Sequence, residues 1–192
     1  MNDPQSLDKT SLRQRMKEVR RELSREDRRN WSAKITASIL RLDAVRQAKN
    51  VFVYVSYRTE VETHGLIREL LAAGKEVATP KVINSPVMNA VVIDTWDDLQ
   101  PGAFGILEPA DGPAHTGPFD VCITPGLAFT TSGKRIGYGQ GHYDHFFAHH
   151  DVASIVGVAF DAQIVSHVPT DVHDRAMDRI VTEQQTILTD SP

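Results

Sequence analysis

A glycine-rich run at residues 133–144 holds the residue types best suited to chemistry in this sequence. It reads Gly-Lys-Arg-Ile-Gly-Tyr-Gly-Gln-Gly-His-Tyr-Asp. Glycine lets backbone amides approach an anion closely and adopts positive φ without strain, so alternating glycines can form an anion-binding nest. Arg135 adds a planar, permanently charged fork that suits phosphate oxygens. Asp144 could hold the Mg²⁺ that accompanies ATP, so we predict a loop that binds phosphate and metal.

Two common nucleotide-binding motifs do not describe this run. A Walker A motif needs four residues between its first glycine and a Gly-Lys-Ser/Thr triplet, whereas six residues separate Gly126 from Gly133, and Lys134 is followed by Arg135. The dinucleotide fingerprint Gly-x-Gly-x-x-Gly is also missing, because the glycines alternate strictly from Gly137 onward. The bland alternative is a flexible turn with solvated charges.

The elements around the run indicate an α/β fold. The apolar stretch 121–124 predicts a buried strand just before the run, and in open α/β sheets ligands bind beyond the carboxyl ends of strands. We expect further strands at 51–55, 76–80, 89–93, 154–160 and 179–181, and helices at 6–24, 25–42, 64–73 and 143–149. Thr63 is expected to cap the third helix and Gly74 to end it. The Pro- and Gly-rich segment 100–118 should wrap the surface.

Size and composition set the wider limits. The chain has 192 residues, 41% hydrophobic and 24% charged, which fits one soluble domain over residues 1–192 with the N-terminal helices, about 6–42, packed on the α/β core. The net charge of -4 gives no general reason to expect a nucleic acid partner. No apolar stretch suggests a membrane or a secretory signal, and the single cysteine, Cys122, excludes an internal disulfide. We expect a cytoplasmic protein.

The order of several motifs resembles the 5-formyltetrahydrofolate cyclo-ligase family, also called methenyltetrahydrofolate synthetases. Pro-Gly-Leu-Ala-Phe at 125–129, then Gly133, and then the run from Arg135 to Asp144 are similar to that family's signature. Lys9 and Arg13 look like its N-terminal nucleotide-binding cations, and Glu60-Val-Glu-Thr resembles its acidic folate-binding segment. The pieces Phe-Gly-Ile-Leu-Glu-Pro at 104–109 and Asp-Arg-Ile-Val-Thr-Glu at 178–183 complete the order.

The resemblance implies an activity, a fold and a set of site residues. The activity is ATP-dependent closure of 5-formyltetrahydrofolate to 5,10-methenyltetrahydrofolate through a phosphorylated formyl group, with ADP and phosphate released. The fold is a single three-layer αβα domain with a mostly parallel sheet, like sugar isomerases and CoA-transferases, and we expect a monomer or weak dimer. Arg135 is the catalytic residue. The implied ATP-binding residues are Lys9, Arg13, Gly133, Lys134, Arg135, Ile136, Gly137, Tyr138, Gly139, Gln140, Gly141, His142 and Tyr143. The implied folate-binding residues are Val55, Glu60, Phe104, Tyr138 and His142, and the Mg²⁺ ligands are Asp144 and Asp178.

Three positions in the run depart from the family pattern. Tyr138 stands where some members carry a basic residue, Gln140 where others have Lys or Gly, and His142 where an aromatic residue is common. Arg135, Lys9 and Arg13 must then supply more of the positive charge. These departures favour an alternative, a catalytically inactive module of the same fold that binds reduced folate or nucleotide. A weaker alternative is a phosphosugar isomerase or CoA-transferase relative, which would need no ATP.

Overall fold

The computed structural model describes residues 8–102, 105–169 and 174–189, and a seven-stranded sheet forms its centre. The strands of this sheet are β1 (Asn50–Val53), β2 (Glu76–Asn84), β3 (Val87–Ile93), β6 (Phe119–Thr124), β9 (Val152–Val158), β10 (Arg179–Val181) and β11 (Thr186–Leu188). Their order is β11-β10-β9-β6-β1-β2-β3. The five inner strands are parallel, and the edge strands β3 and β11 are antiparallel to their neighbours. The predicted mostly parallel α/β sheet is therefore confirmed.

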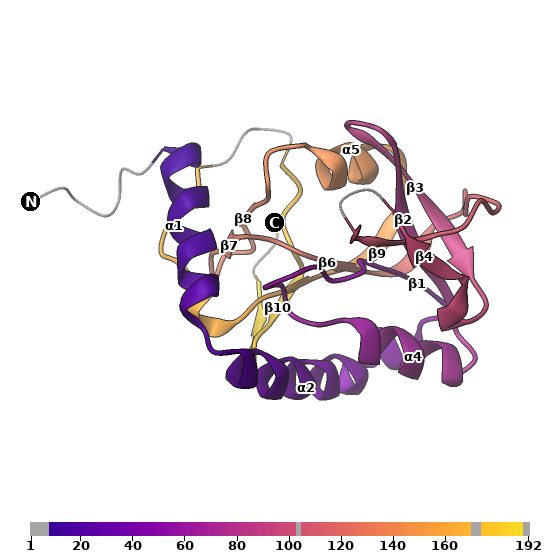
Figure 1. Ribbon diagram of the computed structural model, residues 1–192, viewed down its shortest axis with the longest axis horizontal. Coiled ribbons are helices and arrows are strands. Elements are labelled where there is room, and N and C mark those ends of the chain that lie inside the picture. Colours follow the sequence, from indigo (N-terminus) through magenta and orange to yellow (C-terminus); the bar gives the residue numbers. More distant parts are fainter. Residues whose placement is uncertain (1–7, 103–104, 170–173, 190–192) are drawn as a thin grey trace, which may run out of the picture.

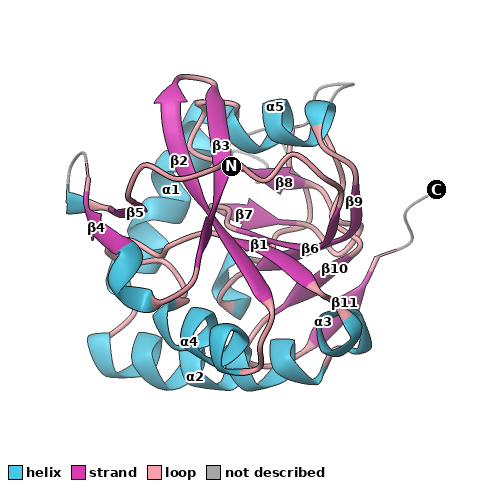
Figure 2. Cartoon of the chain, turned by 90° about the vertical axis from the view of Figure 1, so that its right-hand side faces the viewer, coloured by secondary structure: helices cyan, strands magenta, loops and turns pink. Residues whose placement is uncertain are grey.

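Helices cover both faces of this sheet (Figures 1 and 2). The helices are α1 (Lys9–Glu22), α2 (Arg25–Arg41), α3 (Asp43–Gln47), α4 (His64–Ala72) and α5 (His142–His149). Helices α2 and α4 lie on one face and α5 lies on the other, while α1 stands at one end of the sheet (Figure 1). No helix within the described ranges has the length and apolar character needed to cross a bilayer.

The apolar runs of the central strands explain why the sheet is covered on both faces. Val51, Phe52 and Val53 are fully buried in β1, and Val121 and Cys122 are fully buried in β6. Neighbouring side chains of a strand point to opposite faces, so a continuous apolar run needs cover on both sides. Helices α2 and α4 supply one cover with Ile35, Ile39, Leu66, Ile67 and Leu70. Phe146 of α5 stacks on Phe52 from the other side, with ring centroids 4.4 Å apart.

The N-terminal helices begin at side-chain caps. Asp8 accepts the backbone N–H groups of Thr10 and Ser11 at the start of α1, and Ser24 accepts that of Asp27 at the start of α2. The buried side of α1 does not rest on the main sheet. Leu12 and Met16 pack instead with residues of a small hairpin and the segment that follows β9, namely Leu127, Ala128, Ile136 and Val168. Helix α1 is thereby positioned beside the glycine run.

Some local predictions need correction. Thr63 precedes α4 but forms no side-chain cap. Its hydroxyl donates instead to the carbonyl of Tyr54 at 2.7 Å, so it fastens the loop to the end of β1. Gly74 ends α4 as predicted, with φ of 73° and its N–H donating to the carbonyl of Leu71. The surface segment contains an unpredicted hairpin, β4 (Leu99–Pro101) with β5 (Leu107–Pro109), and β2 runs four residues further than expected, to Asn84.

Candidate active site

The glycine run folds as the second half of a hairpin, a turn and the start of a helix. Strands β7 (Ala128–Phe129) and β8 (Arg135–Ile136) pair antiparallel just beyond the carboxyl end of β6, and α5 begins six residues after β8. Gly139 and Gly141 in the turn have φ of 97° and 70°. Residues other than glycine rarely adopt these φ angles, which explains why glycine occupies both positions. The run therefore joins the end of a buried strand to a helix N-terminus, a combination that suits anions.

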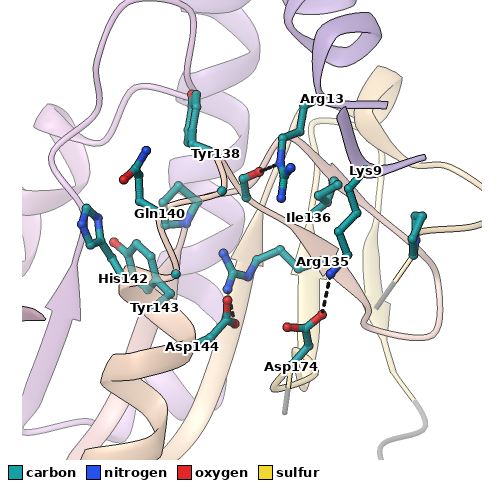
Figure 3. A pocket seen from close by; sticks show the side chains of 15 residues that line it. Lys9, Arg13, Arg135, Ile136, Tyr138, Gln140, His142, Tyr143, Asp144 and Asp174 are labelled. Carbon is teal, nitrogen blue, oxygen red and sulfur yellow. Dashed lines mark hydrogen bonds and ion pairs between the residues drawn. The ribbon is translucent and has the colours of Figure 1, made fainter. Parts of the chain in front are cut away.

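A cavity of about 260 Å³ opens between this turn and α1 (Figure 3). Nearly all of the predicted ATP-binding residues line it, namely Lys9, Arg13 and every residue from Arg135 to Tyr143. Asp144, Pro125, Pro169 and Asp174 complete the lining. Residues more than 120 positions apart in the sequence thus meet around one space. The arrangement brings three cationic side chains and two carboxylates to the same cavity.

Arg135 is the most enclosed of the three cations. Its side chain is only 7% exposed, and its Nη2 donates to Oδ1 of Asp144 at 2.8 Å. The guanidinium carbon lies 5.5 Å from the ring centroid of Tyr143. Within the described part of the chain, the buried Nε of Arg135 has no hydrogen-bond partner. A buried donor without a partner is costly, so an acceptor supplied by a ligand would be favourable here.

Helix α1 contributes the other two cations from one face, at positions i and i+4. Arg13 donates from Nε to the carbonyl of Gly137 at 3.0 Å, which fixes the guanidinium against the turn. Lys9 places its Nζ 4.0 Å from Oδ2 of Asp174 (Figure 3). The sequence pointed to both basic residues. Asp174 as the partner of Lys9 was not foreseen, because the family resemblance drew attention to Asp178 instead.

Two predicted ATP-binding residues lie outside this cavity. Gly133 is buried in the β7–β8 turn with φ of 85°, and its N–H donates to the carbonyl of Thr130 at 3.0 Å. Lys134 is exposed at the end of the same turn, and its N–H donates to the hydroxyl of Thr130 at 3.1 Å. Both residues therefore shape the hairpin that presents Arg135, and neither faces the cavity.

Glu60 lies in the loop between β1 and α4 and contacts the glycine run. The hydroxyl of Tyr138 donates to Oε1 of Glu60 at 2.7 Å, and the N–H of Tyr57 donates to Oε2 at 2.9 Å. Burial raises the pKa of Glu60, while these hydrogen bonds and the nearby charge of Arg20 oppose the increase. The predicted acidic segment is thus brought to the glycine run through Tyr138.

Arg20 is a residue of this region that sequence reasoning missed. It is 4% exposed and donates from Nη2 to the hydroxyl of Tyr138 at 2.6 Å. The available signal was its position, because Leu12, Met16 and Arg20 are spaced four residues apart on one face of α1. A basic residue in an apolar stripe needs a buried partner.

His142 and Tyr143 begin α5, and each carries a buried polar atom. Among the described residues, Nε2 of His142 and the hydroxyl of Tyr143 are buried and form no hydrogen bond. Burial lowers the pKa of His142, which favours its neutral form, and burial raises the pKa of Tyr143 well above its usual value. Both residues line the cavity and present groups that a ligand can satisfy.

The remaining predicted residues are placed as follows. Val55 is buried in the main core beyond β1 and does not line the cavity. Phe104 lies outside the described residues. Asp144 lines the cavity, whereas Asp178 does not, and its carboxylate accepts the N–H of Ile155 at 2.7 Å. The structure therefore brings Asp144 together with Asp174 and leaves Asp178 at the amino end of β10.

The chain is similar to known proteins of one family. The model of the 5-formyltetrahydrofolate cyclo-ligase family matches residues 5–183. A probable 5-formyltetrahydrofolate cyclo-ligase of Caenorhabditis elegans is 30% identical, over 95% of this chain and 96% of the relative. The 5-formyltetrahydrofolate cyclo-ligase of Escherichia coli K12 is also 30% identical, over 87% of this chain and 96% of its own.

A solved structure shows the same fold. The structure of 5,10-methenyltetrahydrofolate synthetase from Aquifex aeolicus, determined by NMR, superposes with a TM-score of 0.84 and 31% identity, over 96% of this chain and 94% of that chain. The family match spans both α1 and the glycine run, which together form the cavity. The chain belongs to the 5-formyltetrahydrofolate cyclo-ligase family.

Proposed function

We propose that this chain is an ATP-dependent ligase that closes 5-formyltetrahydrofolate to 5,10-methenyltetrahydrofolate. The observation that carries the proposal is the cavity in which the glycine run meets Lys9 and Arg13 of α1. Such a cavity offers an anion three cationic side chains, backbone amides and a helix N-terminus, which together suit the phosphates of ATP. Membership of the cyclo-ligase family supplies the reaction.

The reaction consists of a phosphoryl transfer followed by ring closure. The formyl oxygen of the substrate attacks the γ-phosphorus of ATP, and ADP leaves. N10 then attacks the activated formyl carbon and loses its proton, and the C–O bond breaks to release phosphate. Phosphoryl transfer depends mainly on positioning and on the neutralisation of charge. Arg135 neutralises the charge on the phosphates, because it is enclosed and its Nε has no protein acceptor among the described residues.

A magnesium ion fits the carboxylates of this cavity as a companion of ATP. The described residues contain no cluster of three or more Asp, Glu, His or Cys able to hold a metal by themselves. Mg²⁺ normally uses one or two carboxylates together with substrate phosphates and water, and Asp144 and Asp174 both line the cavity. When bound, the ion neutralises charge on the phosphates. Asp144 and Asp174 would hold the ion, and Arg135 and Lys9, which now pair with these carboxylates, would be available to phosphate oxygens.

The folate side of the site lies at Glu60. Its carboxylate accepts N–H donors of the pterin ring, and Tyr138 and His142 contact the substrate from the glycine run. Val55, which is buried in the main core, and Phe104 belong to the proposed folate side on the basis of the family resemblance alone. Because Tyr138 both lines the ATP cavity and touches Glu60, the two substrates would lie next to each other.

The test is an absorbance assay for the methenyl product, run with and without ATP and Mg²⁺. The wild-type chain should form the near-ultraviolet chromophore only when both are present. Arg135→Ala should lower kcat by about a hundredfold or more, as expected for the loss of a group that stabilises developing charge, and should leave folate binding intact. Lys134→Ala is the matched control, because this neighbouring cation is exposed and does not line the cavity. A folded wild-type chain that binds both ligands but forms no product would refute the proposal and favour the inactive binding module.

A further inference from the structure

Two hydrogen bonds in series connect α1 to Glu60 through the side chain of Tyr138. Arg20 donates to the hydroxyl oxygen of Tyr138 at 2.6 Å, and the same hydroxyl donates its proton to Oε1 of Glu60 at 2.7 Å. The three residues come from α1, the glycine run and the β1–α4 loop. Along the chain, Arg20 lies 118 positions from Tyr138 and Glu60 lies 78 positions from it, so only the fold brings the three residues together.

The second bond holds Glu60 in a defined orientation. Oε1 accepts from Tyr138 and Oε2 accepts from the N–H of Tyr57 at 2.9 Å. An ionised carboxylate has about four lone-pair sites, so each oxygen can still accept one more hydrogen bond. A ligand edge with two neighbouring N–H donors could occupy both remaining sites. The protein thus fixes the rotation of the carboxylate and leaves one acceptor site on each of its oxygens.

Arg20 provides the charge that balances this carboxylate. The side chain is almost fully buried, and within the described residues its Nε has no hydrogen-bond partner. A buried guanidinium is expensive unless an anion lies near it, and Glu60 is that anion, one hydroxyl away. Donation from a cation also polarises the hydroxyl of Tyr138 and strengthens its bond to the carboxylate.

We propose that Arg20 and Tyr138 are a positioning pair that keeps Glu60 ionised and oriented for two N–H donors of the pterin ring. This inference rests on the proposed function, because that function makes Glu60 a folate ligand. The positioning pair gives helix α1 a second role in the site. The N-terminal part of the helix serves the phosphates with Lys9 and Arg13, and its C-terminal part serves the folate through Arg20.

The proposal predicts how folate binding depends on pH. The groups that face Glu60 are Tyr138, Arg20, the N–H of Tyr57 and the buried hydroxyls of Tyr54 and Tyr143. Burial raises the pKa of Glu60, and the hydroxyl of Tyr138 and the charge of Arg20 lower it. Removal of either group must therefore raise the pKa further. Glu60 would then become neutral at a higher pH, and folate binding would weaken earlier as the pH falls.

The experiment measures binding of 5-formyltetrahydrofolate without ATP by calorimetry, across acidic to neutral pH, for the full-length chain. Tyr138→Phe keeps the ring and removes only the hydroxyl. We expect Kd to rise about tenfold near neutral pH and the acidic limb to move up by about one pH unit, as for a hydrogen bond to a charged group. Arg20→Gln should move the limb in the same direction.

Lys17→Gln is the matched control. Lys17 lies on the same helix with its Nζ 5.9 Å from the centre of the Tyr138 ring, but it does not donate to the hydroxyl, so the acidic limb should stay in place. An unchanged Kd and limb in Tyr138→Phe would overturn the inference and leave the proposed function standing. Tighter binding would also overturn it, because the hydroxyl would then occupy the ligand's own place on Glu60. A wild-type chain that binds folate with the expected pH dependence but forms no product would refute only the proposed function.

Discussion

Gly133→Ala should destabilise the fold without weakening the binding of ATP. Gly133 belongs to the family's glycine signature, yet its N–H is occupied by the carbonyl of Thr130 and its Cα lies against the chain that precedes β10. A Cβ at this position would lie 2.5 Å from the carbonyl oxygen of Met177 and 3.2 Å from Cβ of Thr189. The first contact is with backbone, which cannot rotate away as a side chain could.

The size of the effect follows from two separate costs. Gly133 has φ of 85°, and an alanine in the left-handed region costs roughly 1–2 kcal/mol. Overpacking against an immovable neighbour adds about 1–3 kcal/mol. The sum, about 2–5 kcal/mol, is a large fraction of the roughly 5–15 kcal/mol that stabilises a typical domain. The variant should therefore unfold at a clearly lower denaturant concentration.

Gly139→Ala is the contrasting variant in the same run. Gly139 also has a positive φ, 97°, but it is exposed and lines the cavity. Its added Cβ would meet the guanidinium of Arg13 at 3.2 Å, the far end of a flexible side chain. Only the backbone cost, about 1–2 kcal/mol, then applies to stability. The added methyl group would intrude where we place the phosphates, so KM for ATP should rise.

Urea unfolding and steady-state kinetics below the unfolding transition separate the two variants. We expect Gly133→Ala to lose the larger part of its stability and to keep KM for ATP near the wild-type value. Gly139→Ala should lose less stability than Gly133→Ala and should raise KM for ATP. If Gly133→Ala instead raised KM for ATP with no loss of stability, the division of the glycine run into a hairpin part and a phosphate part would be wrong.

Two further predictions concern the thiol and the metal. Cys122 is fully buried, which raises its pKa to about 12, so it should resist thiol reagents at mildly alkaline pH until the chain is unfolded, when one thiol should react. Asp144→Asn should raise the Mg²⁺ concentration for half-maximal activity by at least about tenfold. Asp178→Ala should leave that concentration unchanged and lower the free energy of unfolding by about 1–3 kcal/mol, because the N–H of Ile155 loses its acceptor. A changed Mg²⁺ requirement in Asp178→Ala would restore this residue as a metal ligand.

Local patterns predicted the elements of the fold well because they depend on neighbouring residues. The helix predicted at 25–42 begins at the cap residue Ser24, and Gly74 ends α4 as predicted. Thr63 was misread because the same hydroxyl can cap a helix or bind a carbonyl. The carbonyl of Tyr54, which it binds, is nine positions away and is brought near by the loop after β1. Its choice of partner therefore depends on tertiary structure.

For the site, too, residue types carry part of the information and tertiary structure carries the rest. Residue types and family spacing predicted that the cations Lys9, Arg13 and Arg135 share one site, and in the folded chain all three line the same cavity. The same reasoning predicted Gly133 and Lys134 as ATP-binding residues, and in the folded chain neither lines the cavity. Sequence order could not reveal which side of a hairpin faces a ligand, since that depends on how β7 and β8 dock.

The departure at position 138 shows what a comparison of residue types alone would misjudge. A tyrosine in place of a basic residue suggests a weaker grip on anions, and it was one reason to consider an inactive module. In the folded chain, the hydroxyl of Tyr138 accepts a hydrogen bond from the charged side chain of Arg20 in α1 and donates one to Glu60. Positive charge has therefore not left this part of the site. Arg20 of α1 supplies this positive charge, and the hydroxyl of Tyr138 lies between the guanidinium and the carboxylate of Glu60. The tyrosine at position 138 by itself therefore gives no physical reason to expect lost activity.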